Sequence, residues 1–208
     1  MLANWILAEA SNRAAFNEAQ KRWSELVQFD GFIAQVGGWV ESFPATAGIL
    51  AVWRDFSAYR QSLETDHDEL ANQPRKTDWR IVTSIASVIM QICQLDPRRL
   101  AESAQCLRIS DATLQPNSSP IFVARQMETW NPALRSADGM LGALICRVDR
   151  NRDRFLGATF WRDRAALENF QQAIFPEISK QAGTETYMKS LVSYHFTLEP
   201  SWSVVKPA

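Results

Sequence analysis

The sequence predicts an α+β protein in which two tandem ferredoxin-like (βαββαβ) repeats form a pseudo-dimeric α+β barrel within one chain. The first observation behind this prediction is an internal duplication. Asp-Gly at residues 30–31 is followed by Trp-Arg-Asp at 53–55, and Asp-Gly at 138–139 is followed at the same spacing by Trp-Arg-Asp at 161–163. The repeat distance of 108 residues is about half of the 208-residue chain, so the duplicated unit is a whole module.

The second observation is the order of hydrophobic patterns in the first half, where strand-like and helix-like segments alternate. Ser11 or Asn12 is placed to cap the first helix, and Pro74 marks the end of the second. The expected elements are a strand at 2–8, a helix to about 27, strands at 32–40 and 49–53, a helix at 57–70 and a strand at 81–93.

The second half repeats this order. Ser119 and Pro120 open a helix because proline suits the first helical position, and Asp163 caps the next helix, which Pro176 should kink or restart. The expected elements are a strand at 105–113, a helix to about 134, strands at 141–148 and 155–161, a helix to about 178 and a strand at 191–198. We therefore expect a first repeat at 1–95, a joint at 96–104 and a second repeat at 105–208.

The composition indicates which classes of protein and which partners are compatible with this chain. Hydrophobic residues make up 46% of the chain and the net charge is −1, which favours a packed core and disfavours nucleic acid or an anionic membrane as a partner. The charged run at 147–154 mixes both signs and is interpreted as a solvated hairpin tip. The longest apolar run, 81–93, is too short to span a membrane, and three cysteines without a CxxC pair indicate free thiols. A cytoplasmic location is the resulting expectation.

The space enclosed by the two repeats is the expected place for a ligand. A ferredoxin-like sheet is covered by helices on one face and is bare on the other, so two such sheets are expected to bring their bare faces together. A small molecule then fits between the sheets, or between a sheet and a covering helix. We expect a monomer with pseudo-twofold symmetry, or a weak homodimer.

Two histidines, His67 and His195, are the candidate catalytic residues because imidazole titrates near neutral pH. His67 falls on the inward side of the second expected helix. In the last strand His195 alternates with apolar residues, and we expect it to point into the space between the sheets together with Ser193 and Thr197. Both histidines could instead be buried residues with satisfied hydrogen bonds.

The candidate ligand-binding residues lie in the first half. Strand alternation places Gln35 and Trp39 on one face, away from Phe32, Ala34 and Val36, and Asn4 is expected to join them. Trp53 and Tyr59 complete the candidate set. Because Trp53 recurs as Trp161, a structural role is the competing interpretation. Asp55 and Asp163 are expected to cap helices, with Arg54 and Arg162 as surface ion partners.

The motifs resemble a known group of proteins. Residues 16–20 (FNEAQ), Trp23 and residues 35–39 (QVGGW) are similar to YdbC-like bacterial proteins. Residues 52–55 (VWRD), with Tyr59 and His67, are similar to the wider antibiotic-biosynthesis-monooxygenase and dimeric α+β barrel superfamily. The resemblance implies that two ferredoxin-like units pair into a barrel, but the YdbC-like group implies no established activity.

The superfamily includes cofactor-independent oxygenases of polycyclic phenols and enzymes that cleave haem. Haem-cleaving members have a Trp and a His on the helix that follows the strand Trp. The positions in this chain fall near Ser62 and Asn72, and near Phe170 and Lys180, and neither half has that pair. Asn4 matches the first-strand Asn of that branch only approximately. Haem cleavage is therefore disfavoured by the sequence.

Three functions remain open at this point. The first is the binding of a small apolar or aromatic molecule without a reaction, and the second is cofactor-independent, monooxygenase-like catalysis that uses a histidine as base. The third is a structural or interaction protein whose cavity is filled by its own tryptophans, of which there are eight. No cofactor or metal is expected, because the sequence has no phosphate loop and no histidine or cysteine pair at metal-ligand spacing.

Overall fold

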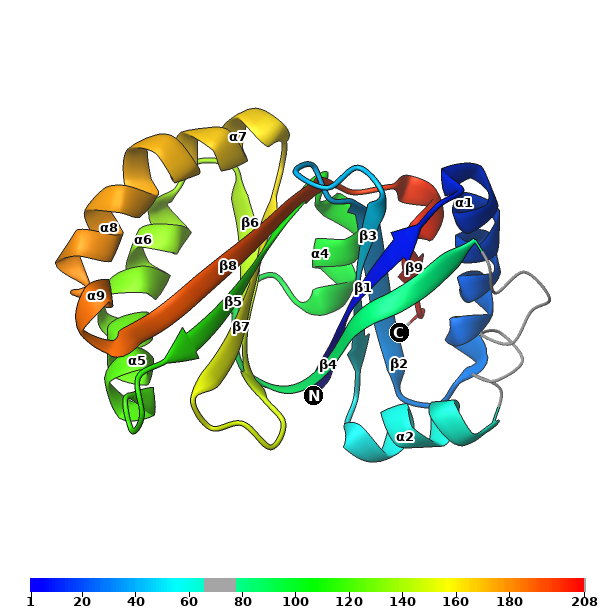
Figure 1. Cartoon of the computed structure of the whole chain (residues 1–208), viewed down its shortest axis with the longest axis horizontal. Helices are drawn as coiled ribbons and strands as arrows, with labels where there is room; N and C mark the ends of the chain where they lie inside the picture. The colour runs from blue at the N-terminus through cyan, green and yellow to red at the C-terminus, as the bar shows by residue number, and fades with distance from the viewer. Residues whose placement is uncertain (66–77, 208) are drawn as a thin grey trace.

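The computed structural model describes residues 1–65 and 78–207, and it forms two lobes that share one sheet (Figure 1). The first repeat contains β1 (Leu2–Ala10), α1 (Arg13–Lys21), the 3-10 helix η1 (Arg22–Gln28), β2 (Phe32–Trp39), β3 (Thr46–Trp53), α2 (Phe56–Thr65) and β4 (Trp79–Gln94). The helix α4 (Pro97–Ser103) then leads into the second repeat.

The second repeat contains longer, composite helices. Its elements are β5 (Cys106–Leu114), α5 (Ser119–Arg125), the π-helical turn η2 (Gln126–Trp130), α6 (Asn131–Ser136), β6 (Met140–Val148), β7 (Arg154–Trp161), α7 (Arg164–Asn169), the π-helical turn η3 (Phe170–Ile174), α8 (Phe175–Gln181), α9 (Thr184–Tyr187) and β8 (Met188–Thr197). The 3-10 helix η4 (Pro200–Trp202) and β9 (Val204–Val205) end the chain. The predicted order of strands and helices is thus confirmed in both repeats.

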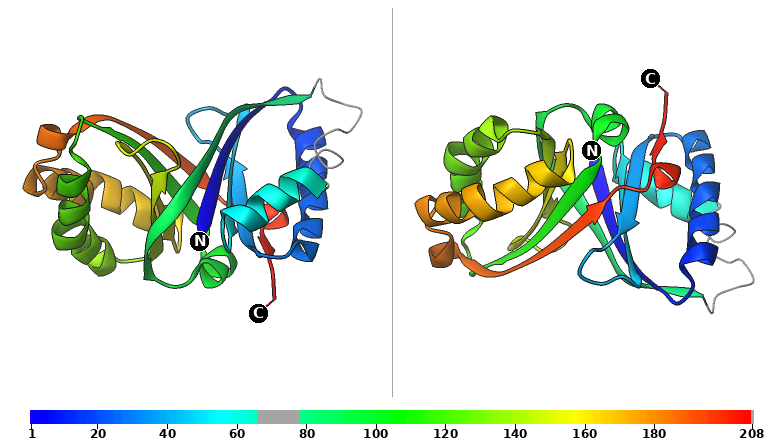
Figure 2. Two further views of the ribbon diagram at one scale, coloured as in Figure 1. Left: turned by 90° about the horizontal axis from the view of Figure 1, so that it is seen from below. Right: turned by 90° about the horizontal axis from the view of Figure 1, so that it is seen from above.

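The two sheets join at their edges and enclose a common interior. The strand order is β8-β5-β7-β6-β4-β1-β3-β2-β9, with β4 and β6 pairing antiparallel at the junction of the repeats. At the other edge a bridge between Gly38 and Leu198 connects β2 to the residue after β8. Figure 2 shows the helices of each repeat outside the strands, at opposite ends of the molecule. The predicted intrachain α+β barrel is therefore confirmed.

The barrel interior is an apolar core to which both repeats contribute. Trp5 on β1 is fully buried and its ring lies 5.7 Å from that of Phe196 and 5.8 Å from that of Tyr194, both on β8. Gly48 leaves room for this indole, since a Cβ at Gly48 would lie 2.6 Å from the ring. Leu100 of α4 is also fully buried in this core, between the two lobes in Figure 1.

The duplicated motif builds the same corner in each repeat. Arg54 makes a bidentate ion pair with Asp30 and also contacts Asp55, which accepts a hydrogen bond from the Ala58 amide at 2.8 Å. The second repeat has the same contacts from Arg162 to Asp138 and Asp163, and the same cap on Ala166. The predicted caps and ion partners are confirmed.

A glycine is required at each of these corners. Gly31 and Gly139 have positive φ values of 78° and 73°, and a Cβ on either would lie within 2.5 Å of an alanine Cβ in the helix that follows. Both the backbone conformation and the close approach exclude a side chain. This explains why Asp-Gly occurs twice at the same distance from Trp-Arg-Asp.

Both long helices of the second repeat contain a π-helical turn ahead of a proline. Pro132 and Pro176 have no amide hydrogen to donate, and the hydrogen bonds shift to the i→i+5 pattern at Gln126 and Phe170. The predicted disturbance at Pro176 is therefore a π turn that precedes it, after which the helix continues as α8. The extra residue in each turn changes which side chains face the sheet.

Two details of the first repeat differ from the sequence prediction. The register between β2 and β3 shifts between Phe32 and Ala34, and this bulge puts Phe32 on the helix-covered face with Trp53. Phe32 thus does not share a face with Ala34 and Val36, as alternation alone predicted. The strand β4 is also longer than the predicted 81–93.

The C-terminal segment crosses back to the first repeat. The strand β9 pairs with β2, Trp202 packs against α1, and Lys206 donates hydrogen bonds to the backbone of the first repeat at Ile33 and Phe29. The division into repeats at 96–104 remains a prediction. Residues 202–206 nevertheless pack on the first repeat rather than on the second.

Candidate functional site

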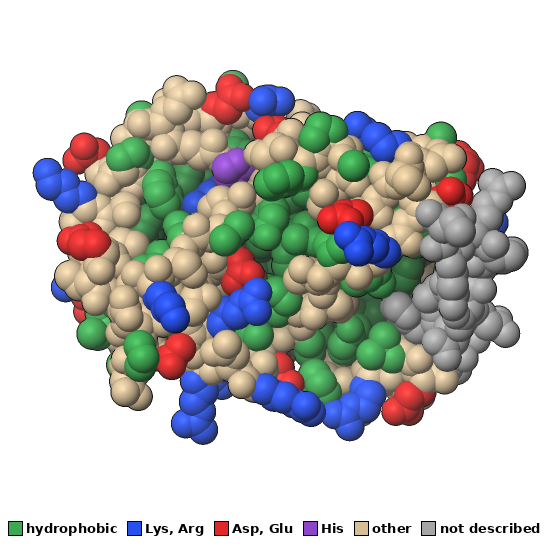
Figure 3. All heavy atoms as spheres, viewed as in Figure 1, with side chains coloured by type: hydrophobic (Ala, Val, Ile, Leu, Met, Phe, Trp, Pro, Cys, Tyr) green, Lys and Arg blue, Asp and Glu red, His purple; other side chains and the backbone are tan. Residues whose placement is uncertain are grey.

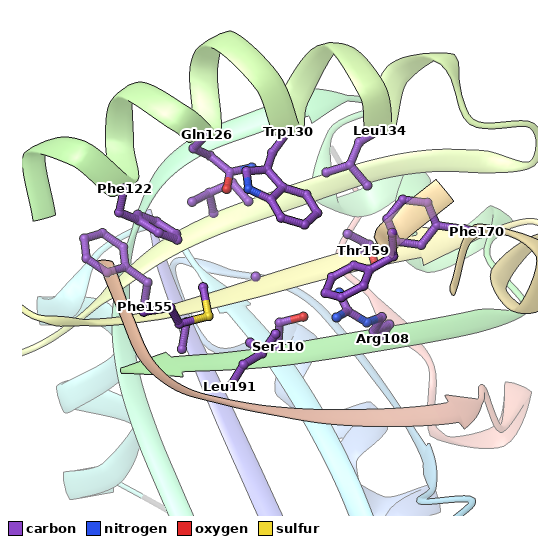
Figure 4. A pocket seen from close by; sticks show the side chains of 15 residues that line it. Arg108, Ser110, Phe122, Gln126, Trp130, Leu134, Phe155, Thr159, Phe170 and Leu191 are labelled. Carbon is purple, nitrogen blue, oxygen red and sulfur yellow. The ribbon is translucent and has the colours of Figure 1, made fainter. Parts of the chain in front are cut away.

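A pocket lies between the sheet and the helices of the second repeat (Figure 4). Its cavity volume is about 70 Å³, and the hollow opens to solvent at its mouth. It is lined by Arg108, Ser110, Ala112, Phe122, Gln126, Trp130, Leu134, Ile145, Phe155, Gly157, Thr159, Phe170, Phe175, Met188 and Leu191.

The walls of the pocket are mostly aromatic. Trp130 and Phe170 come from the two π turns and Phe122 and Phe175 from the neighbouring helical turns, and Figure 4 shows Phe122 and Trp130 above the strands. The rings of Trp130 and Phe175 lie 5.3 Å apart, so the π turn η2 and the helix α8 meet at this wall. The π turns thus place large rings around the space instead of filling it.

The floor of the pocket carries a buried cation. Arg108 on β5 is only 7% exposed, and its Nη2 donates to the Ser193 hydroxyl at 3.0 Å. Its guanidinium also lies 4.9 Å from the centre of the Phe175 ring. Among the residues that the structure describes, no carboxylate pairs with this guanidinium. Burial lowers the pKa of Arg108 to about 10, so the side chain stays charged at neutral pH.

Two polar atoms at the floor have no partner in the described structure. They are Nε of Arg108 and the hydroxyl of Ser110, two residues further along β5 on the same face. Most buried polar groups in proteins have a hydrogen-bond partner, and each exception needs an explanation. In a pocket, a bound molecule is one such explanation.

A hydrogen-bonded chain fixes the amide of Gln126 at the pocket wall. Gln126 donates from Nε2 to Oδ1 of Asn131 at 2.8 Å, and Asn131 donates to Oε1 of Gln91 on β4 at 2.9 Å. Because the amide nitrogen is engaged, the carbonyl oxygen of Gln126 is left as the atom that can accept from a ligand.

The structure places His195 on a different face from the one predicted. His195 is the direct partner of Arg108 in the β5–β8 ladder, so it lies on the helix-covered face of the sheet. Tyr194 and Phe196 occupy the barrel interior instead, because they pack against Trp5. His195 is not among the residues that line the pocket. Its suggested catalytic role remains a prediction.

The environment of His195 keeps the ring neutral. Burial, with a smaller effect from the charge of Arg108, lowers the pKa of His195 from 6.5 to about 4. The unfolded chain therefore binds a proton near pH 6.5 that the folded chain binds only near pH 4, so this residue makes stability fall as the pH falls through that window.

We expect a His195→Gln variant to lose less stability than the wild type between pH 7 and pH 5. The difference should be on the order of 1 kcal/mol or less, because solvent reaches part of the ring. Urea unfolding of both proteins at the two pH values measures it. An equal decrease in both proteins would show that the pKa of His195 is not lowered by folding.

Asn4, Trp53 and Tyr59, three of the candidate residues of the first repeat, lie close together. Asn4 is buried and accepts a hydrogen bond from Ser84 at 3.4 Å, and Trp53 lies 5.9 Å from Tyr59, ring centre to ring centre. Burial raises the pKa of Tyr59, and a hydrogen bond with Ser84 opposes that rise. Gln35 lies in the same row across the sheet as Asn4, with Ala51 between them.

Trp39 lies in a separate aromatic cluster, and His67 lies outside the described residues. The Trp39 ring is 5.3 Å from Trp202 and 5.5 Å from Phe16, and Trp202 is fully buried. A Cβ on Gly37 would lie 2.9 Å from the Trp202 ring, so this glycine makes room for the indole. The C-terminal segment thus fills space between α1 and the sheet.

The residue that sequence reasoning missed is Arg108. Its position in the second repeat is that of Asn4 in the first. Asn4 lies two residues after Leu2, the strand partner of Trp53, and Arg108 lies two residues after Cys106, the strand partner of Trp161. Ser84 and Ser193 match in the same way as their polar neighbours. Aligning the first strands of the two repeats would have flagged an arginine within an apolar strand pattern.

The charges on the surface, the possible metal ligands and the helix lengths give little information about the partners of the protein. Lys and Arg side chains and Asp and Glu side chains both occur across the face seen in Figure 3. In residues 1–65 and 78–207, no three histidine, cysteine, aspartate or glutamate side chains gather in a way that could hold a metal ion. The described helices include none long and apolar enough to cross a membrane.

The first repeat is similar in sequence to known proteins. Residues 2–86 match the family described as Domain of unknown function (DUF4937). The uncharacterized protein YdbC of Bacillus subtilis is 41% identical over 64 residues, which are 30% of this chain and 54% of YdbC. The chain thus spans about half the length of this curated relative. The predicted YdbC-like resemblance is confirmed.

The whole chain is similar in fold to solved structures. A putative monooxygenase from Fusobacterium nucleatum superposes with a TM-score of 0.75 at 11% identity, over 95% of this chain and 91% of that one. A putative monooxygenase from Lactobacillus acidophilus superposes with a TM-score of 0.65 at 11% identity, over the full length of both chains. The chain is a tandem ferredoxin-like α+β barrel with the fold of these two putative monooxygenases, and its first repeat resembles YdbC.

Proposed function

We propose that the protein binds a small, flat, largely apolar molecule in the pocket of the second repeat. The observation that carries this proposal is an open pocket walled by aromatic rings, with a few fixed polar groups at its floor. Flat aromatic molecules suit such walls because rings pack face to face or edge to face with other rings. The place of the ligand is thus between a sheet and its covering helices, one of the two spaces expected from the sequence.

Binding without a reaction is favoured over base catalysis. Among the described residues that line the pocket, Arg108 is the one ionisable side chain, and no carboxylate or imidazole stands ready to remove a proton. The predicted base His195 lies beside Arg108 but does not line the space. The third possibility, a cavity filled by tryptophans, suits the packing of Trp39 and Trp202 in the first repeat.

The pocket floor offers a direct test through Gly157. A Cβ on Gly157 would meet its nearest neighbours at 3.8 and 3.9 Å, so a side chain fits there without strain and projects into the pocket. We expect Gly157→Leu to abolish the binding of a neutral aromatic probe, 2-naphthamide, measured by isothermal titration calorimetry. Gly157→Ala, the matched control, should bind the probe with nearly unchanged affinity.

The outcomes separate the competing functions. If Gly157→Leu binds the probe as tightly as the wild type, or if the wild type binds neither this probe nor its acid analogue 2-naphthoate, the pocket is not the ligand site. Circular dichroism and the unfolding midpoint of both variants establish that the fold is kept. The folded but non-binding leucine variant is then the result that supports the proposal.

The monooxygenase-like alternative is favoured by one observation, the unpaired guanidinium of Arg108. A fixed positive charge in an apolar pocket stabilises a negative charge that develops on a substrate oxygen. The two solved relatives named as putative monooxygenases fit this alternative by fold. Oxygen uptake by the purified protein with a polycyclic phenol tests it. If the wild type consumes oxygen no faster than the Arg108→Met variant does, the monooxygenase-like alternative is wrong and binding without a reaction is retained.

A further inference from the structure

We propose that the pocket of the second repeat selects an aromatic acid, a flat molecule whose single carboxylate is held by Arg108 and Ser110. This inference rests on the proposed function, because it names the class of molecule that the aromatic pocket takes. Two features of the pocket support it: the unpaired hydrogen-bond donors at one end of the floor, and the aromatic side chains that line the remaining walls.

The donors are arranged to receive one anionic group. Arg108 and Ser110 alternate with Ile109, so both side chains leave β5 on the face that the helices cover. Figure 4 shows the Ser110 hydroxyl and the Arg108 guanidinium next to each other below the aromatic side chains. Among the described residues that line the pocket, the Nε of Arg108 and the Ser110 hydroxyl are the two buried side-chain atoms without a partner.

The positive charge of Arg108 would be stabilised by a bound anion. A buried cation is costly unless a charge or several hydrogen bonds compensate it. In the described structure Arg108 has one hydrogen bond, to Ser193, and one aromatic contact, with Phe175. Neither partner carries a negative charge, so a carboxylate on a bound molecule would complete the site through charge-assisted hydrogen bonds.

The rest of the lining sets the size and polarity of the molecule. Beyond Arg108 and Ser110, the polar side chains at the described pocket are Gln126 and Thr159, and the others are apolar. A single guanidinium suits a monoanion better than a phosphate ester, which would need more positive charge. Phe122 and Phe155 lie at the end of the pocket away from Arg108 in Figure 4, where an aromatic body packs.

A purely structural role for Arg108 is the competing explanation. In that case its hydrogen bond to Ser193 and its contact with Phe175 hold β5, β8 and α8 together, and the pocket does not discriminate between an acid and a neutral analogue. The two explanations predict different affinities for 2-naphthoate and 2-naphthamide, which have the same ring system and nearly the same shape.

Calorimetric titration at pH 7.5 tests the selection. We expect the wild type to bind 2-naphthoate about tenfold to a hundredfold more tightly than 2-naphthamide, as one charge-assisted interaction predicts. Arg108→Met should remove this preference by weakening the acid and leaving the amide nearly unchanged. Arg108→Lys keeps the charge without the planar fork and should retain part of the preference. Arg152→Met, at an exposed arginine of the β6–β7 hairpin, is the matched control and should bind as the wild type does.

Each outcome decides the inference. Equal affinities of the wild type for the two probes overturn the inference alone, while the proposed aromatic site stands. A pocket that binds neither probe overturns the proposed function and the inference together. If Arg108→Met does not fold, Ser110→Ala replaces it, with a severalfold loss for the acid expected and no change for the amide. An unchanged acid preference in every folded variant also overturns the inference.

Discussion

Replacing Trp5 with alanine is expected to destabilise the protein by about 3–5 kcal/mol, the usual cost of removing a fully buried large aromatic side chain. Trp5 stands in the barrel interior and stacks on Phe196 with an angle of 9° between the rings. Because its partners belong to the other repeat, the loss should lower the stability of the whole barrel. Urea unfolding followed by circular dichroism measures the free energy.

Two control variants locate the effect. Trp5→Phe keeps a ring against Phe196 and should lose much less stability than Trp5→Ala. Phe43→Ala, in the β2–β3 loop with 58% of the side chain exposed, should change stability by about 0.5 kcal/mol or less. An unfolding curve in which Trp5→Ala melts only the first repeat would contradict a single shared core.

Replacing Trp202 with alanine should have an effect of similar size, about 3–5 kcal/mol, for a different reason. This indole fills the space between α1 and the sheet of the first repeat, 5.3 Å from Phe16 and 5.3 Å from Trp39. We expect the variant to gain an apolar cavity in the first repeat. Calorimetry with 2-naphthamide should then detect a second binding site beside that of the second repeat.

Ser201→Ala is the control because this exposed serine precedes Trp202 in the same 3-10 helix. It should keep the stability and the single site of the wild type. A Trp202→Ala protein as stable as the wild type would mean that the C-terminal segment contributes little to the first repeat. A stable variant without a second site would mean that the neighbouring rings close the space.

The sequence by itself determined the repeat, the order of elements and the two corners. Asp55 caps its helix three residues on, while Arg54 reaches Asp30 and Gly31 approaches Ala58 across the β2–β3 hairpin; the second repeat has the same contacts. Because the motif recurs with the same residue types at the same spacing, the sequence displays these corners directly. The internal duplication added the pairing of two modules, because each leaves one sheet face bare.

Only the tertiary structure decided which faces and which repeat form the site. Alternation divides the residues of β8 into two sets, but it does not say which set faces the helices. The packing of Tyr194 and Phe196 on Trp5 settles that choice and puts His195 beside Arg108. The π turns ahead of Pro132 and Pro176, with Trp202 filling the first repeat, leave the open aromatic pocket in the second. These outcomes depend on contacts between segments far apart in sequence, which spacing and composition cannot supply.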